Sequence, residues 1–146
     1  MKNRQVEILL IEDSAHDAEM TIRALRKHNF ANKVTHLGDG DEALDFIFGT
    51  GKYAERNISN NPIVILLDLK MPKVDGIEVL RKVKSDQRTK TIPVVVLTSS
   101  KEDPDVKTCY ELGVNSYIVK PVGFDNFTDA IKELGSYWLL LNTHTK

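Results

Sequence analysis

Polar residues that can handle a phosphoryl group stand directly after four segments with the composition of β-strands. They are Glu12 and Asp13, Asp68, Thr98, and Lys120. A divalent cation held by carboxylates, together with an ammonium and a hydroxyl group, can neutralise and bind phosphoryl oxygens. The remaining carboxylate can act as the nucleophile, because aspartate side chains form aspartyl phosphates. The elements that carry these residues must bring them together.

The predicted strands place these residues at one edge of a sheet. Most of the strands are short apolar runs rich in β-branched residues, as in parallel sheets buried on both faces. They cover residues 6–11, 33–37, 63–67, 93–97 and 115–119. Open α/β sheets bind ligands at the carboxyl ends of their strands. Carboxylates that meet there would repel one another without a cation, and Mg²⁺ prefers such hard oxygen ligands.

Helical periodicity fills the intervals between the strands. The predicted helices lie near residues 14–29, 43–48, 76–85, 103–113 and 125–141. Ser14 has the spacing of a helix cap, and Gly113 is the expected stop of the fourth helix. In that helix we expect Val106, Cys109 and Tyr110 to face the core. Five strands alternating with five helices predict an α/β fold with a doubly wound parallel sheet.

Composition limits the class of protein. The chain has 146 residues, 41% hydrophobic and 28% charged, and a net charge of −1, which suits a single soluble domain spanning 1–146. Its basic residues are spread along the sequence, which argues against nucleic-acid binding. No apolar run has the length of a membrane span, and the single cysteine, Cys109, fits a reducing compartment. We therefore expect a cytoplasmic protein.

Four motifs together give the chain a family resemblance. They are Glu12-Asp13-Ser14, Asp68-Leu-Lys-Met-Pro72 with Asp75-Gly76, Leu97-Thr98-Ser99, and Val119-Lys120-Pro121. In this order, and over essentially the whole chain, they resemble the receiver domain of two-component response regulators. The resemblance implies a CheY-like, flavodoxin-like (βα)5 fold with strand order 2-1-3-4-5. One departure is Glu12, where many receivers have aspartate.

The resemblance also implies roles for individual residues. Asp68 would accept a phosphoryl group from a sensor histidine kinase. Asp13, Asp68 and the carbonyl of Lys70 would bind Mg²⁺, with Glu12 acting through water. Thr98 and Lys120 would bind phosphoryl oxygens, and the bond between Lys120 and Pro121 would be cis. Tyr117 would be the aromatic residue that changes position together with Thr98, although an aromatic residue in a strand can also be part of the core.

A narrower resemblance concerns the long polar loop at residues 49–61 and the ending Ser136-Tyr-Trp-Leu139. Both resemble single-domain regulators paired with phytochrome-type histidine kinases. The loop is long enough to be either mobile or used for contact. Only a five-residue polar tail follows the last predicted helix, so we expect no output domain and signalling through protein contact. Such a protein is not an enzyme, although it takes part in its own phosphotransfer and slow dephosphorylation.

The last predicted helix suggests a partner surface. Tyr137 and residues 139–141 make its end apolar on nearly all sides, which contact with one sheet cannot bury. By resemblance to receivers, we expect a homodimer through the face of the fourth helix, fifth strand and fifth helix. The alternative is that these side chains pack on the protein's own helices.

Rival functions fit these motifs less well. A haloacid dehalogenase-type phosphatase needs a second aspartate two residues after the nucleophile, where this chain has Lys70. A flavodoxin needs a phosphate-binding first turn, and the anionic pair Glu12-Asp13 would repel the phosphate of FMN. The four histidines lack metal-ligand spacing and are expected at the surface. A receiver-like protein that binds partners without phosphorylation stays open as an alternative.

Overall fold

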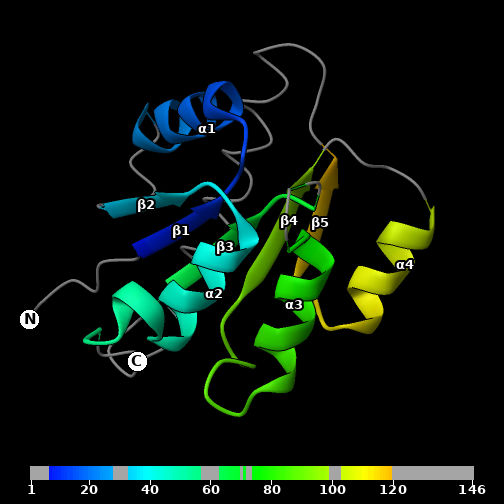
Figure 1. Ribbon diagram of the computed structural model, residues 1–146. Helices are drawn as coiled ribbons and strands as arrows, with labels where there is room; N and C mark the ends of the chain where they lie inside the picture. Colours follow the sequence, from blue (N-terminus) through cyan, green and yellow to red (C-terminus); the bar gives the residue numbers. More distant parts are fainter. Residues whose placement is uncertain are drawn as a thin grey trace, which may run out of the picture.

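A five-stranded parallel sheet forms the centre of the computed structural model, which describes residues 7–27, 33–56, 63–69, 71, 74–98 and 103–119 (Figure 1). The strands are β1 (Glu7–Ile11), β2 (Lys33–Leu37), β3 (Ile63–Leu67), β4 (Val94–Thr98) and β5 (Ser116–Val119). Their order in the sheet is β2-β1-β3-β4-β5, and every neighbouring pair is parallel. The predicted fold class and strand order are therefore confirmed.

Helices cover both faces of this sheet. They are α1 (Ala15–Lys27), α2 (Gly40–Phe48), α3 (Gly76–Ser85) and α4 (Asp103–Glu111), with a short 3₁₀ helix, η1 (Gly51–Tyr53). In Figure 1, α1 lies on one side of the sheet and α2, α3 and α4 lie on the other. The fifth predicted helix lies outside the described residues. In the part of the chain that the structure describes, no helix combines the length and apolarity needed to cross a membrane.

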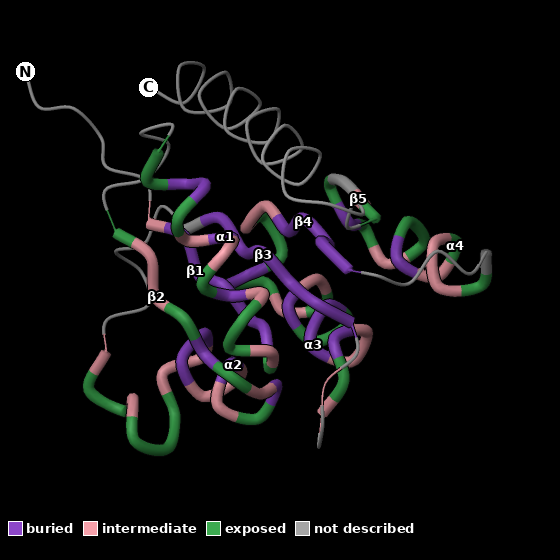
Figure 2. Tube along the Cα trace, turned by 90° about the horizontal axis from the view of Figure 1, so that it is seen from above, coloured by how far each residue is buried: buried purple, intermediate pink, exposed green. Residues whose placement is uncertain are grey.

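Alternating strand residues build two separate cores. Ile8, Leu10, Leu66 and their neighbours pack against the buried face of α1. Leu9, Ile65 and the residues of the same parity pack against α2, α3 and α4. This division follows from the two-residue period of a strand, which sends successive side chains to opposite faces. Figure 2 shows that the buried residues concentrate in β1, β3 and β4, the strands that are flanked on both sides.

Side-chain caps fix where the helices begin. The backbone N–H of Asp17 donates to Ser14 Oγ at 3.2 Å, as the spacing predicts. Asp39 Oδ1 accepts the N–H of Glu42 at 2.8 Å, so α2 begins three residues earlier than its apolar pattern indicates. A side chain at Gly40, the first residue of α2, would clash with the carbonyl of Val74, so this helix packs closely on the connection after β3.

The fourth helix corrects one prediction. Cys109 is fully buried and Val106 is half-buried, but Tyr110 is 53% exposed. This helix lies toward the edge of the sheet, next to β5, so only a narrow stripe of it meets the core. Its end is as predicted, because Gly113 has a φ of 99° beyond the last turn. The inward orientation predicted for Tyr110 is wrong.

The described half of the long loop is held against α2. The hydroxyl of Tyr53 donates to Glu42 Oε2 at 2.8 Å, and its ring meets Phe46 edge-on with centroids 5.1 Å apart. Arg56 Nη1 donates to the carbonyl of Phe46 at 2.7 Å, and its guanidinium lies 4.0 Å from the Phe46 ring centroid. Residues 49–56 are therefore used for contact within the domain, while residues 57–61 lie outside the described part.

Candidate functional site

Asp68 is the first residue after β3 and is only 7% exposed. Its backbone N–H donates to the carbonyl of Ile11 at 3.0 Å, which continues the ladder between β1 and β3. A side chain at Gly76 would clash with the carbonyl of Asp68 and would lie 2.6 Å from Leu69 Cα. The start of α3 therefore presses directly on the backbone of the candidate nucleophile, and only glycine fits there.

Strand register brings Glu12 beside Asp68. Ile11 is paired with Leu67 across the two central strands, so the next residue of each strand stands at the same level. Glu12 is 3% exposed, and its Oε2 accepts the backbone N–H of Ser14 at 3.1 Å. Asp13 follows and is exposed. The sheet thus holds two buried carboxylates and one exposed carboxylate at the same edge.

These three side chains form a compact acidic cluster. Glu12, Asp13 and Asp68 each offer a carboxylate oxygen, and these oxygens lie within 4.8 Å of one another. Carboxylate oxygens at such separations repel strongly, and a hard divalent cation between them removes the repulsion. The donor set is all oxygen, which suits Mg²⁺, Mn²⁺ or Ca²⁺ better than softer metals. The predicted meeting of these three residues is confirmed.

Thr98 and Tyr117 lie on neighbouring strands and face the same side of the sheet. Thr98 ends β4 and is fully buried, and its register partner on β5 is Val119. Tyr117 is paired with Val96, two residues before Thr98, and packs partly buried against the core beneath α2, α3 and α4. The two side chains therefore lie on one face of the same strand pair, where a change in the packing of one can affect the other.

Two predicted site residues and one backbone feature lie outside the described residues. These are Lys70, Lys120 and the bond between Lys120 and Pro121. Their predicted roles stay predictions. Of the histidines, His16 and His36 are exposed, as expected.

One contact at this edge was not predicted from the sequence. His36 Nε2 lies 2.7 Å from the carbonyl oxygen of Glu12. A carbonyl can only accept, so this nitrogen carries the proton. The position of His36 near the end of a strand is the only sequence signal for this contact, since it places the ring at the same edge as the acidic residues.

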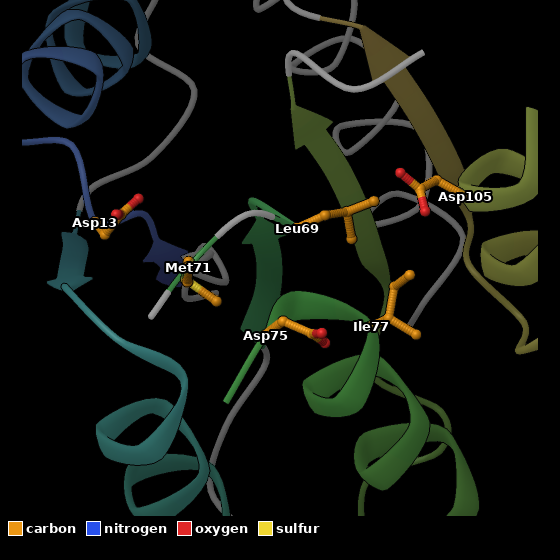
Figure 3. Close-up of a pocket in the computed structure, with 6 residues that line it drawn as sticks. All are labelled: Asp13, Leu69, Met71, Asp75, Ile77 and Asp105. Atoms are coloured by element: carbon orange, nitrogen blue, oxygen red, sulfur yellow. The ribbon is translucent and has the colours of Figure 1, made fainter. Parts of the chain in front are cut away.

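A pocket opens beside the acidic cluster (Figure 3). Its volume is about 450 Å³, and its lining residues are Asp13, Leu69, Met71, Asp75, Ile77 and Asp105. Among its acidic lining residues, Asp105 lies outside the motifs quoted from the sequence. Asp105 lies in the first turn of α4, and this helix follows Thr98 in the chain. That position is the sequence signal that places Asp105 near the carboxyl ends of the strands.

The fold and the acidic edge define a doubly wound α/β domain with the donor set of a divalent cation site at the carboxyl ends of its central strands. The response regulator receiver domain family matches residues 8–132. The chain therefore belongs to the family of response regulator receiver domains.

Named relatives agree with this assignment. The response regulator Rcp1 of Synechocystis is 39% identical over 132 residues, covering 90% of this chain and 88% of the relative. The probable methanogenesis regulatory protein FilR2 of Methanothrix harundinacea is 40% identical over 132 residues, covering 90% and 83%.

Solved structures are similar over nearly the whole chain. The phosphorylated cyanobacterial phytochrome response regulator RcpA has a TM-score of 0.85 and 36% identity, covering 94% of this chain and 95% of that one. The Mn²⁺-bound form of Rcp1 has a TM-score of 0.82 and 38% identity, covering 93% and 95%. The protein is thus a signalling phosphoacceptor of the two-component type, with a histidine kinase as its partner, and not a classical enzyme.

Proposed function

We propose that Asp68 is the phosphoacceptor and that Asp13, Asp68 and the carbonyl of Lys70 hold Mg²⁺, with Glu12 acting on the metal through water. The observation that carries this proposal is the approach of the three carboxylates to within 4.8 Å at the ends of β1 and β3. When bound, the cation supplies positive charge that offsets the charge of a phosphoryl group. Asp68 is the buried carboxylate at the end of the central strand β3, which suits a nucleophile held in one orientation.

In the proposed transfer, a carboxylate oxygen of Asp68 attacks the phosphorus atom of a phosphohistidine on the kinase. A P–O bond forms, the P–N bond breaks, and the imidazole leaves with the electron pair. Lys120 and Thr98 bind the phosphoryl oxygens. Thr98 then moves toward the phosphoryl group and Tyr117 turns inward, which shifts the population between two packings of β4 and β5. The placement of Thr98 and Tyr117 on one face of this strand pair supports that coupling.

We further infer a phytochrome-type kinase as the partner, because the similar structure RcpA is a phytochrome response regulator, and the similar structures RtBRR and AtBRR, at 49% and 50% identity, are bacteriophytochrome response regulators. The protein acts in the cytoplasm, in keeping with its one free and buried thiol, Cys109. Its output contact is a homodimer through α4, β5 and the segment of the fifth predicted helix. Tyr110 at 53% exposed and Val119 at 36% exposed lie on that face and support this surface.

Intact-mass measurement after incubation with acetyl phosphate and Mg²⁺ tests the proposal. The wild type should gain the mass of one phosphoryl group, and a chelator should prevent the gain. Thr98→Ala should still be phosphorylated but should lose the change in partner affinity. A wild type that gains no mass would favour the alternative in which the domain binds partners without phosphorylation.

A further inference from the structure

Residues 49–56 attach to the first turn of α2 through one carboxylate. Glu42 Oε2 accepts the hydroxyl of Tyr53 at 2.8 Å and lies 2.8 Å from Nζ of Lys52. The hydrogen bonds from Lys52 and from Tyr53 lower the pKa of Glu42, so they stabilise its charged form. Lys52 is exposed, and exposed ion pairs contribute little to stability. The charge-assisted bond from Tyr53, whose ring also packs against Phe46, is therefore the principal link.

The turn that carries Glu42 is also the part of α2 that meets the connection after β3. Gly40 lies so close to the carbonyl of Val74 that a side chain there would clash. Val74 is half-buried and packs against the core beneath α2, α3 and α4. A shift of the first turn of α2 must therefore displace Val74, because no side chain at Gly40 can adjust between the two backbones.

The same connection runs from Asp68 to the start of α3. At its far end, the N–H of Gly76 donates to the carbonyl of Leu69 at 3.0 Å, and Gly76 lies against the carbonyl of Asp68. Lys70 belongs to this connection in the sequence, and its carbonyl is a proposed ligand of the cation. A ligand on a segment that is fixed at both ends requires less ordering when the cation binds.

The attachment of residues 49–56 also includes a contact that favours their release. Arg56 Nη1 donates to the carbonyl of Phe46, but Arg56 Nη2 is buried without a hydrogen-bond partner among the described residues. A buried N–H group without an acceptor destabilises the attached state. Burial also lowers the pKa of this guanidinium. A segment held in this way can open locally while the rest of the domain stays folded.

We propose that the attachment of residues 49–56 to α2 sets the affinity of the acidic cluster for its cation, with Tyr53 as the positioning residue. In the attached state, the first turn of α2 holds Val74 and thereby the connection that carries Lys70. Release of the segment leaves this turn less constrained, so the cation must order the connection itself. The inference rests on the proposed function, because the cation is the one proposed at the acidic cluster. By linkage, the cation must favour the attached state by the same factor.

Calorimetric titration with Mg²⁺ tests the effect of the segment on the cation. Tyr53→Phe removes only the hydroxyl and Tyr53→Ala also removes the ring, and neither changes the charge of the domain. We expect the dissociation constant of Mg²⁺ to rise about twofold in the first variant and about fivefold in the second. At saturating Mg²⁺, both variants should be phosphorylated by acetyl phosphate at the rate of the wild type, because the reacting groups are unchanged.

Amide hydrogen exchange tests the effect of the cation on the segment. The backbone N–H groups of Tyr53, Ala54 and Arg56 donate to carbonyls within residues 50–56. Saturating Mg²⁺ should slow their exchange in the wild type, by about the factor that separates Tyr53→Ala from the wild type in Mg²⁺ affinity. A role of Tyr53 in stability alone would leave this exchange independent of Mg²⁺.

Thr89→Val is the matched control, because it removes one hydroxyl and its 2.7 Å bond to the carbonyl of Val83 at the opposite end of the sheet. It should lower stability without changing Mg²⁺ affinity. The inference is overturned if Tyr53→Ala binds Mg²⁺ as tightly as the wild type, if Thr89→Val weakens binding equally, or if exchange does not respond to Mg²⁺.

Labelling by acetyl phosphate separates this inference from the proposed function. A wild type that binds Mg²⁺ and is phosphorylated, with unchanged affinity in Tyr53→Ala, overturns the inference alone. A wild type that binds Mg²⁺ but is not phosphorylated, with lowered affinity in Tyr53→Ala, overturns the proposed transfer to Asp68 and supports the inference. A wild type that binds no Mg²⁺ overturns both.

Discussion

Charge is arranged in opposite ways at the two ends of the sheet. At the carboxyl ends, three carboxylates lie within 4.8 Å of one another. At the amino ends, the half-buried Lys84 donates from Nζ to the carbonyl of Ile92 at 2.7 Å, to that of Lys90 at 3.2 Å and to Asn115 Oδ1 at 3.5 Å. One end gathers like charges, whereas the other surrounds a single cation with acceptors.

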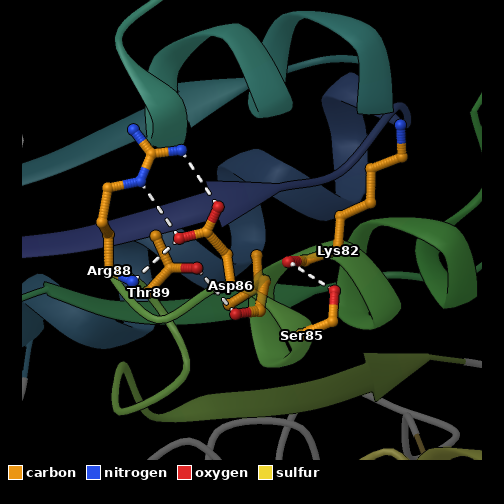
Figure 4. Close-up of polar contacts among 6 residues, drawn as sticks. Lys82, Ser85, Asp86, Arg88 and Thr89 are labelled. Carbon is orange, nitrogen blue, oxygen red and sulfur yellow. Dashed lines mark hydrogen bonds and ion pairs between the residues drawn. The ribbon is translucent and has the colours of Figure 1, made fainter.

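In the turn that leads into β4, also at the amino ends, polar side chains are likewise paired by hydrogen bonds (Figure 4). Asp86 Oδ1 accepts the backbone N–H of Arg88 at 2.8 Å and its Nε–H at 3.0 Å. The buried hydroxyl of Thr89 donates to the carbonyl of Val83 at 2.7 Å. At the amino ends the polar groups are hydrogen-bonded and stabilise the fold, whereas the carboxyl ends carry the groups for phosphoryl transfer. Substitutions at the two ends should therefore affect stability and phosphorylation separately.

The largest effect is expected from Asp68→Asn, which should abolish Mg²⁺-dependent phosphorylation. The amide keeps the shape of the side chain but loses the nucleophile and a metal ligand. Intact-mass measurement with acetyl phosphate gives the result, and circular dichroism should show an unchanged fold. Stoichiometric labelling of this variant would show that another residue accepts the phosphoryl group, and would contradict the assignment of Asp68.

Alkaline pH should lower the free energy of unfolding through the buried thiol of Cys109. Burial, and to a lesser degree the charge of Asp105, raises the pKa of the Cys109 thiol to about 11. A thiol whose pKa is raised in the folded state contributes stability that is present below its ordinary pKa and is lost as the pH rises toward 11. The free energy of unfolding should fall by up to about 3 kcal/mol across that window.

Denaturant titrations at pH 8 and pH 11 measure this loss, with Cys109→Ala as the control that lacks the thiol. The difference between wild type and control isolates Cys109 from other groups that titrate at high pH. An equal pH dependence in both proteins would show that the thiol is not protected from ionisation.

Lys84→Met should lower the free energy of unfolding by about 2 kcal/mol, because the carbonyls of Lys90 and Ile92 lose their donor. Lys82→Met removes an exposed lysine from the same helix and should change stability by less than about 0.5 kcal/mol. Urea titration measures both. Phosphorylation should be unaffected in either variant, and a large loss of labelling in Lys84→Met would show that the two ends are not separate.

The smallest effect is expected from Asp13→Asn without divalent ions. Removing one of three crowded negative charges should stabilise the fold by about 0.5 kcal/mol. The same change should weaken Mg²⁺ binding, measured by calorimetry. If the variant is less stable than the wild type in metal-free buffer, Asp13 makes a contact that stabilises the fold by more than the repulsion destabilises it.

The sequence predicted the acidic end better than the amino end. Glu12, Asp13 and Asp68 follow apolar strands, and parallel strands must end at one edge, so their meeting follows from topology alone. Lys84 has no such signal, because its position on α3 is that of an ordinary surface lysine. Its acceptors come from the turn before β4 and from Asn115, 31 positions away.

The sequence pattern also could not predict which side chains of α4, near the edge of the sheet, face the core. Tyr110 and Cys109 are adjacent, and helical periodicity allows either to face the core. The position of α4 next to β5 decides between them, because the narrow contact admits only Cys109. The contact of His36 with the Glu12 carbonyl depends in the same way on how the edge strand β2 is placed.

The two glycine contacts around residues 68–76 restrict how this region can evolve. Gly40 of α2 meets the carbonyl of Val74, and Gly76 meets the carbonyl of Asp68. The connection is therefore enclosed at both of its ends by backbone rather than by side chains that can move aside. An insertion or deletion between Leu69 and Asp75 would displace α2 or α3 bodily. Among functional variants, length changes should be absent from this connection even where single substitutions are accepted.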